Sequence, residues 1–335
     1  MEKQRNQSLD VLKGIACIAI VLMHCKFPGI FGEIINAMTR WSVPLFFAVA
    51  GYFSYRATLE SCLKKVRHIF NITIVVTSIY VVYTGIAQLL AGTLKEYCHA
   101  EFTLKNLGVF IFFNRPLIAF GHLWFLYSLL YVYVIYALYL FTFKKMRIYW
   151  LIPVLYSVHL FLAYGSYLFG HPLSNTFYRN FLFFGLPSFL LGMWVREKIE
   201  KMESARILQY GRVGGFIALG FIALSAVERI VIGRGFDMHI CSLVALVGLL
   251  YFASADLAGK FSLLNVIGVK YSLTVYVVHW GVFRALDDVY IAVGISDNTV
   301  VQWLRPIVAV CISLLIAFAA RKIIHITERP RRKAA

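Results

Sequence analysis

The chain has 335 residues, of which 60% are hydrophobic and only 15% are charged, and its formal net charge is +17. Soluble globular domains average about 25% charged residues, so this composition excludes an ordinary soluble protein. We expect one integral membrane domain over residues 1–335, with a core at about 8–325 and a basic cytoplasmic tail at 326–335. The positive charge belongs to short loops of such a protein and does not indicate nucleic-acid binding.

The apolar segments predict an all-α bundle of about ten membrane-spanning helices, because one span needs about 20 apolar residues. These segments are 11–27, 41–55, 69–91, 121–143, 148–165, 180–196, 213–232, 238–257, 262–283 and 301–321. With the N-terminus in the cytoplasm, and with residues near the ends of spans counted with the adjoining segment, 21 of the 33 Lys and Arg residues are inner and 10 are outer, and Lys13 and Lys270 stay within spans. This asymmetry predicts that both termini are cytoplasmic.

Two segments are predicted to lie on the outer side without crossing. Residues 103–120 contain an apolar stretch, Val109–Phe113, that is too short for a span and fits an interfacial or re-entrant piece. Residues 165–180 are predicted to form a loop. The six cysteines form no Cys-x-x-Cys pair and most lie in predicted spans, so we expect neither a disulfide framework nor a metal site.

The first predicted span carries ionisable groups on one face. Lys13 and His24 are eleven residues apart, about three helical turns, and Asp10 and Cys17 share their face. Ionisable groups inside a membrane are costly and often functional. His24 alone is equally consistent with an interfacial histidine that marks the end of a span. Its common face with Lys13 favours a functional role, in which an imidazole acts as base or acid near neutral pH.

A basic cluster precedes the third predicted span. Lys64, Arg67 and His68 lie on one side of a helix, and Lys65 pairs with His68 three residues later. Such a cluster can bind phosphates, but it is also typical of a positive anchor on the cytoplasmic side.

Two further sets are candidates for substrate contact. Ser272, Tyr276 and His279 recur at four- and three-residue spacing, so they share a helix face and could bind a substrate or join helices. Trp124 and Tyr127 lie at the outer end of a predicted span, where aromatic belts are common.

Together these residues resemble the membrane acyltransferase-3 family, polytopic bacterial acyltransferases that modify surface glycans. The family's opening Arg-x-x-x-Leu-Asp and its later basic residue and histidine are similar to Arg5, Leu9, Asp10, Lys13 and His24. Further similar motifs occur in the family's order at Phe46–Phe53 (with Ala50 where the family has serine), Lys64–His68, His122–Leu126, Phe189–Met193, Ser272–His279 and Glu328–Pro330.

The resemblance implies a multi-pass protein of the bacterial inner membrane that transfers an acyl group to a hydroxyl of a cell-surface or lipid-linked glycan. The donor it implies is cytosolic acetyl-CoA or another acyl-CoA. His24, with Lys13 and Asp10, is then the catalytic group, acting as a base or as a transient acyl carrier. The implied donor site is Lys64, Lys65, Arg67 and His68, with the family's basic pair at Lys64/Arg67 or at Lys65/His68. The implied acceptor contacts are Trp124, Tyr127, Ser272, Tyr276 and His279.

The bilayer, the glycan, acyl-CoA and a second copy of the chain are therefore the candidate partners. Two other functions fit the same pattern of buried charges. One is a transporter of a small molecule or a lipid-linked glycan, and the other is a binding or regulatory membrane domain without the chemistry.

Overall fold

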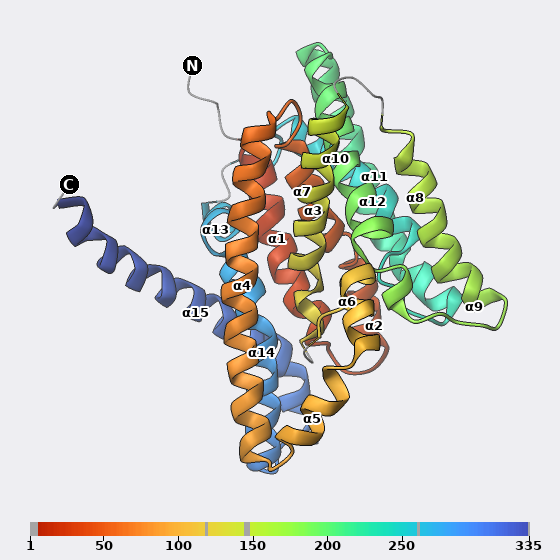
Figure 1. Cartoon of the computed structure of the whole chain (residues 1–335). Helices are drawn as coiled ribbons and strands as arrows, with labels where there is room; N and C mark the ends of the chain where they lie inside the picture. The colour runs from red at the N-terminus through yellow and green to blue at the C-terminus, as the bar shows by residue number, and fades with distance from the viewer. Residues whose placement is uncertain (1–5, 118–119, 144–147, 260–261, 334–335) are drawn as a thin grey trace. The chain divides into compact units, whose positions relative to one another are not determined.

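The protein is entirely helical wherever its structure is described. A computed structural model describes residues 6–117, 120–143, 148–259 and 262–333. This part of the chain contains α-helices and short 3-10 and π turns, and no strand (Figure 1). The predicted all-α fold is therefore confirmed.

The helices form two compact units. Unit 1 contains the residues up to 46 and those from 201 onward, and unit 2 contains residues 47–200. The elements of unit 1 are α1 (Gln7–His24), α2 (Gly29–Met38), α11 (Ser204–Ile232), α12 (Ile240–Ser254), α13 (Ser262–Val266), the π turn η5 (Ile267–Tyr271), α14 (Ser272–Ala292) and α15 (Thr299–Lys333). Helix α3 (Ser42–Tyr52) begins in unit 1 and ends in unit 2.

The elements of unit 2 are α4 (Leu59–Leu90), α5 (Leu94–Glu101), α6 (Leu104–Phe113), η1 (Gly121–Leu123), α7 (Trp124–Thr142), α8 (Leu151–Leu160), η2 (Phe161–Gly165), α9 (Ser166–Leu168), η3 (Asn175–Phe177), η4 (Phe181–Gly185) and α10 (Leu186–Glu200). Helix α6 is ten residues long, about 15 Å, so it cannot cross a bilayer. This agrees with the short non-spanning segment expected at 103–120.

Eight helical segments of the described chain are long and apolar enough to cross a membrane. They are Gln7–His24, Gly29–Tyr52, Leu59–Leu90, Gly121–Thr142, Leu151–Leu168, Ser204–Ile232, Leu263–Ala292 and Thr299–Ile323. Each overlaps one predicted span. The other two predicted spans correspond to α12, which has 15 residues, and to the run from η4 through α10, whose last turns are charged. The protein is thus a multi-pass membrane protein.

Several helices extend beyond the predicted spans into polar sequence. Helix α4 begins at Leu59, ten residues before the predicted span, because the Thr58 hydroxyl accepts the Ser61 N–H and caps it. The whole basic cluster is therefore helical. The backbone of α15 is helical to Lys333, so most of the predicted basic tail continues the last helix. The side chains of Glu328–Pro330 lie outside the described part of the chain.

Glycines allow very close backbone contact inside each unit. In unit 2, a Cβ on Gly51 would lie 1.8 Å from the Phe189 carbonyl oxygen, and one on Gly192 would lie 1.8 Å from that of Ala48. In unit 1, a Cβ on Gly268 would lie 1.9 Å from the Asp10 carbonyl oxygen. No real Cβ fits at such distances, so these glycines set how closely α3 approaches α10 and α1 approaches η5.

The contact at Gly268 yields a stability test. We expect Gly268→Ala to lower the apparent melting temperature, because the new methyl group forces α1 and η5 apart at a cost of about 1–3 kcal/mol. Gly220→Ala on α11 is the matched control, since its Cβ would meet no atom within 4 Å and alanine favours a helix. Thermal unfolding of both variants in detergent measures the difference, and equal melting temperatures would contradict the contact.

Candidate functional site

Helix α1 lies at the centre of unit 1. Its Cys17 and Val21 belong to a buried cluster that also contains Ile267 of η5, Val275 of α14 and Ala309 of α15. On the predicted polar face, Asp10 and Cys17 are buried and Lys13 and His24 are half-buried. This face is therefore turned largely toward the interior of unit 1.

The two charges at the start of α1 neutralise each other. The Lys13 ammonium lies 2.8 Å from the Asp10 carboxylate, one turn away, and the two side chains are only 19% and 7% exposed. Asp10 also lies in the first turn of α1, where a negative charge interacts favourably with the helix dipole. The pair makes a buried cation tolerable in an apolar span.

His24 lies against two rings of α14. Its ring centroid is 5.2 Å from that of His279 and 5.3 Å from that of Trp280, which meets it edge-on. The His279 Nδ1 atom lies 2.7 Å from the Tyr276 carbonyl oxygen. A carbonyl can only accept, so this bond assigns a proton to Nδ1 of His279, and in the neutral ring Nε2 then carries the lone pair.

Helices α1 and α14 run in the same direction. The Cys17 thiol of α1 lies 3.9 Å from the Ser272 carbonyl oxygen of α14. Seven residues further along each helix, His24 meets His279. Parallel first and ninth spans are what the predicted topology requires. The Ser272 hydroxyl donates to the Gly268 carbonyl one turn earlier, 3.0 Å away, so it is used within its own helix.

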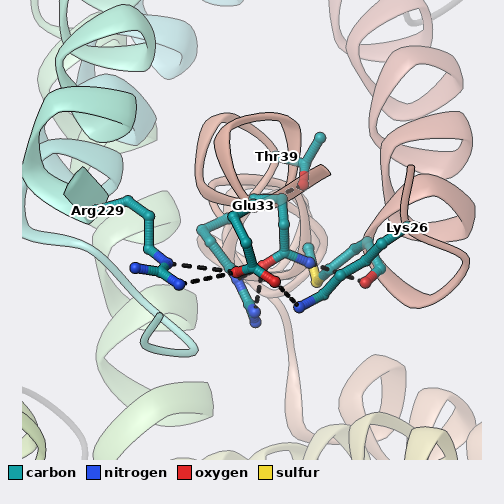
Figure 2. Close-up of polar contacts among 7 residues, drawn as sticks. Lys26, Glu33, Thr39 and Arg229 are labelled. Atoms are coloured by element: carbon teal, nitrogen blue, oxygen red, sulfur yellow. Dashed lines mark hydrogen bonds and ion pairs between the residues drawn. The ribbon is translucent and has the colours of Figure 1, made fainter. Parts of the chain in front are cut away.

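Helix α2 holds the end of α1 in place. The Asn36 amide donates to the Met23 carbonyl at 2.8 Å, next to His24. The Arg40 guanidinium in turn binds the Asn36 side-chain oxygen (3.0 Å) and Asp237 (3.3 Å). Figure 2 shows the neighbouring network of α2, in which Glu33 lies between Lys26 and Arg229. These ties orient the last turn of α1, and with it the His24 ring.

The sequence analysis missed a group of charged residues beyond His24. The Arg284 guanidinium lies 5.9 Å from the centre of the Trp280 ring, and Arg305 of α15 pairs with Asp287 of α14 at 2.9 Å. Both arginines lie in helices. The spacing of Trp280, Arg284 and Asp287 at four and three residues on one helix face was the signal that could have found them.

The basic cluster of α4 divides into two kinds of residue. The half-buried Lys65 ammonium donates to the Ser54 hydroxyl at 2.9 Å and to the Phe53 carbonyl at 3.3 Å, so it holds the chain after α3. Lys64, Arg67 and His68 are exposed on the same helix. Lys64 meets Glu60 at 2.7 Å, but both side chains are at least 75% exposed, and such pairs are weak. Two pairs of residues could match the family's basic motif, Lys64/Arg67 and Lys65/His68. Lys64/Arg67 is thus the pair of which both side chains are accessible.

Trp124 and Tyr127, predicted as one pair, border different cavities of unit 2. The Trp124 ring is buried, with the Arg179 guanidinium 5.4 Å from its centre. The Tyr127 hydroxyl is hydrogen-bonded to Thr77 at 2.7 Å and lines an apolar groove of about 740 Å³ formed by α4, α6 and α7. The described residues contain no group of three His, Cys, Asp or Glu able to hold a metal ion.

Comparison with known proteins identifies the class. A family model described as an acyltransferase domain, Acyl_transf_3, matches residues 6–322. The chain therefore belongs to the acyltransferase-3 family and is a membrane acyltransferase. Comparisons with curated proteins and with solved structures found no match.

The Asp10–Lys13 pair yields a second stability test. Asp10→Ala leaves the Lys13 ammonium without its carboxylate in a poorly solvated site, and we expect a loss of about 3–5 kcal/mol. The double variant Asp10→Ala/Lys13→Ala should recover part of this loss, because no uncompensated charge remains. Thermal unfolding of the four proteins forms a double-mutant cycle. Strictly additive effects would contradict the pairing.

Proposed function

We propose that this membrane acyltransferase moves an acyl group, most simply acetyl, from cytosolic acyl-CoA to a hydroxyl of a cell-surface or lipid-linked glycan. The observation that carries the proposal is the contact of His24 with His279 and Trp280 at one end of the buried helix α1. An imidazole fixed in this way is suited to take a proton from a hydroxyl. The family resemblance supplies the donor and the glycan acceptor.

The donor's phosphates fit the exposed cations of α4. Lys64 and Arg67 lie on one helix face and are accessible, whereas Lys65 is held by Ser54 and Phe53. Arginine can bind a phosphate through two N–H groups, and lysine adds a point charge. We assign these two residues to the donor's phosphates and a supporting role to Lys65.

On the base route, the acceptor hydroxyl attacks the thioester carbonyl carbon. A C–O bond forms, the C–S bond breaks, and His24 takes the hydroxyl proton and gives it to the leaving thiolate, which departs as the thiol of coenzyme A. On the carrier route, a His24 ring nitrogen attacks the thioester carbon first, so that a C–N bond forms and the C–S bond breaks. The hydroxyl then attacks the acyl-imidazole carbon, a C–O bond forms, the C–N bond breaks, and the hydroxyl proton passes to the thiolate. In both routes, the orientation of the His24 ring depends on His279, Trp280 and the Asn36 bond to Met23.

The charge distribution supports an orientation with both termini in the cytoplasm and the His24 end of α1 toward the outer side. Donor phosphates then bind on the cytoplasmic side and the acceptor approaches from outside. We propose the bacterial inner membrane as the location, with the bilayer as the partner of the exposed apolar helix faces and a second copy of the chain as a further candidate partner.

The role of His24 is tested directly by its removal. We expect His24→Ala to lower the transfer of labelled acetyl from acetyl-CoA to a glycan acceptor by about 10²–10⁴-fold, the usual contribution of a positioned acid or base. His171→Ala is the control, because His171 is exposed in the loop after α9. Transfer is measured with purified protein in lipid. Full transfer by the His24 variant would exclude it as base and as carrier.

The donor site is tested by comparing cations of the same helix. We expect Lys64→Ala/Arg67→Ala to raise the acyl-CoA KM about tenfold or more, since contacts to charged groups contribute about 1.5–3 kcal/mol each. The acceptor KM should stay unchanged. Raising the salt concentration should also raise the donor KM of the unaltered protein, because salt screens exposed charges.

Lys65→Ala provides the contrast for this test. Because this variant loses the bonds to Ser54 and Phe53, we expect a lower melting temperature and a smaller change in the donor KM than in the Lys64/Arg67 double variant. An unchanged donor KM in the Lys64/Arg67 double variant would overturn the assignment of the donor site.

A further inference from the structure

Unit 2 contains a small polar pocket that the roles given above touch only through Trp124. It encloses about 180 Å³ and is lined by the end of α5, the segment after α6, the start of α7 and the loop around η3. Its lining includes Glu101, Arg115, Trp124, Asn175, Thr176 and Arg179. Apart from Glu101 and Trp124, these residues come from the two segments that the sequence predicts to lie on the outer side without crossing. A volume of this size suits a small ligand such as one sugar ring.

The pocket is built around a buried asparagine. Asn114 is fully buried and has a positive φ of 49°, a conformation that asparagine tolerates better than most residues. Its side-chain oxygen accepts the Phe181 N–H at 2.7 Å, and its amide donates to the Trp124 carbonyl at 3.2 Å. Asn114 therefore ties three separate segments together, and the position of the lining does not depend on a ligand.

Charge and ring geometry indicate what the pocket can bind. Arg179 lies over the buried Trp124 ring, and the exposed Arg115 lines the same pocket. Two guanidinium groups and the Glu101 carboxylate leave one net positive charge. This balance suits a ligand with a single negative charge better than a dianionic phosphate.

We propose that this pocket binds a carboxylate-bearing sugar residue, such as a uronic acid, of the acceptor glycan. Arg115 and Arg179 would bind its carboxylate through paired N–H groups. The Asn175 amide and the Thr176 hydroxyl can donate to and accept from ring hydroxyls, and Glu101 can accept from one. This inference rests on the proposed function, because it names the class of glycan that the acyltransferase receives.

Saturation-transfer NMR on the protein in lipid nanodiscs tests the inference without an acyl donor. The probes are methyl glucuronide, methyl glucoside and glucose 6-phosphate. We expect the glucuronide to bind at least tenfold more tightly than the other two. The double variant Arg115→Gln/Arg179→Gln should lose this preference, and Lys105→Gln, an exposed cation of α6 outside the pocket, should keep it.

Three results would overturn the inference: equal binding of glucuronide and glucoside, tighter binding of the phosphate, or an unchanged preference in the double variant. If the double variant is poorly folded by thermal unfolding, Arg115→Gln alone serves, because Arg115 is exposed and its loss leaves the Asn114 bonds in place. His24→Ala should keep the glucuronide preference. Failure of acyl transfer would therefore be distinguishable from failure of this site.

Discussion

The close backbone contact between α1 and the α13–η5 segment is the constraint on which unit 1 depends. Added Cβ atoms on Gly14 and Gly268 would lie 2.2 Å and 1.9 Å from carbonyl oxygens of the other segment. Because these backbones nearly touch, η5 leads into α14 beside α1, and the two helices continue in parallel. The contact of His24 with His279 follows from that alignment, so the candidate reaction centre is placed by helix packing.

The family motifs separate into packing and chemistry when they are placed in the structure. The glycines of the second-span motif and of Phe189–Met193 meet each other's helix backbone, so both motifs serve the contact of α3 with α10. Ser272 bonds within its own helix. Among the ionisable residues of these motifs, Lys64 and Arg67 are exposed and His24 is half-buried, whereas His279 is buried. A glycine can thus belong to a family motif because a neighbouring helix backbone passes close to it, and not because it contacts a substrate.

Several charged groups in the described part of this apolar protein occur in pairs or in networks. Asp10 neutralises Lys13, Glu33 bridges Lys26 and Arg229, and Asp287 binds Arg305. Burial makes an unpaired charge costly. The pair of Glu33 with Arg229 also connects residues 196 positions apart in the sequence, whereas Asp10 and Lys13 lie one turn apart on α1. The end of α1 is the clearest example, since Asn36, Arg40 and Asp237 together hold the carbonyl next to His24.

The sequence by itself determined the helical class, the approximate positions of the spans and the polar face of α1, because hydropathy and helical periodicity are local properties. It also singled out His24 and His279, through their spacing from other polar residues. Only the tertiary structure decided that these two rings meet, that Lys65 is a packing residue while Lys64 and Arg67 are accessible, and that Trp124 and Tyr127 border different cavities. Those outcomes depend on which helices cross and how closely. The crossings are set by glycine contacts and buried polar pairs between residues far apart in the sequence. The contact of Gly268 with the Asp10 backbone is one example.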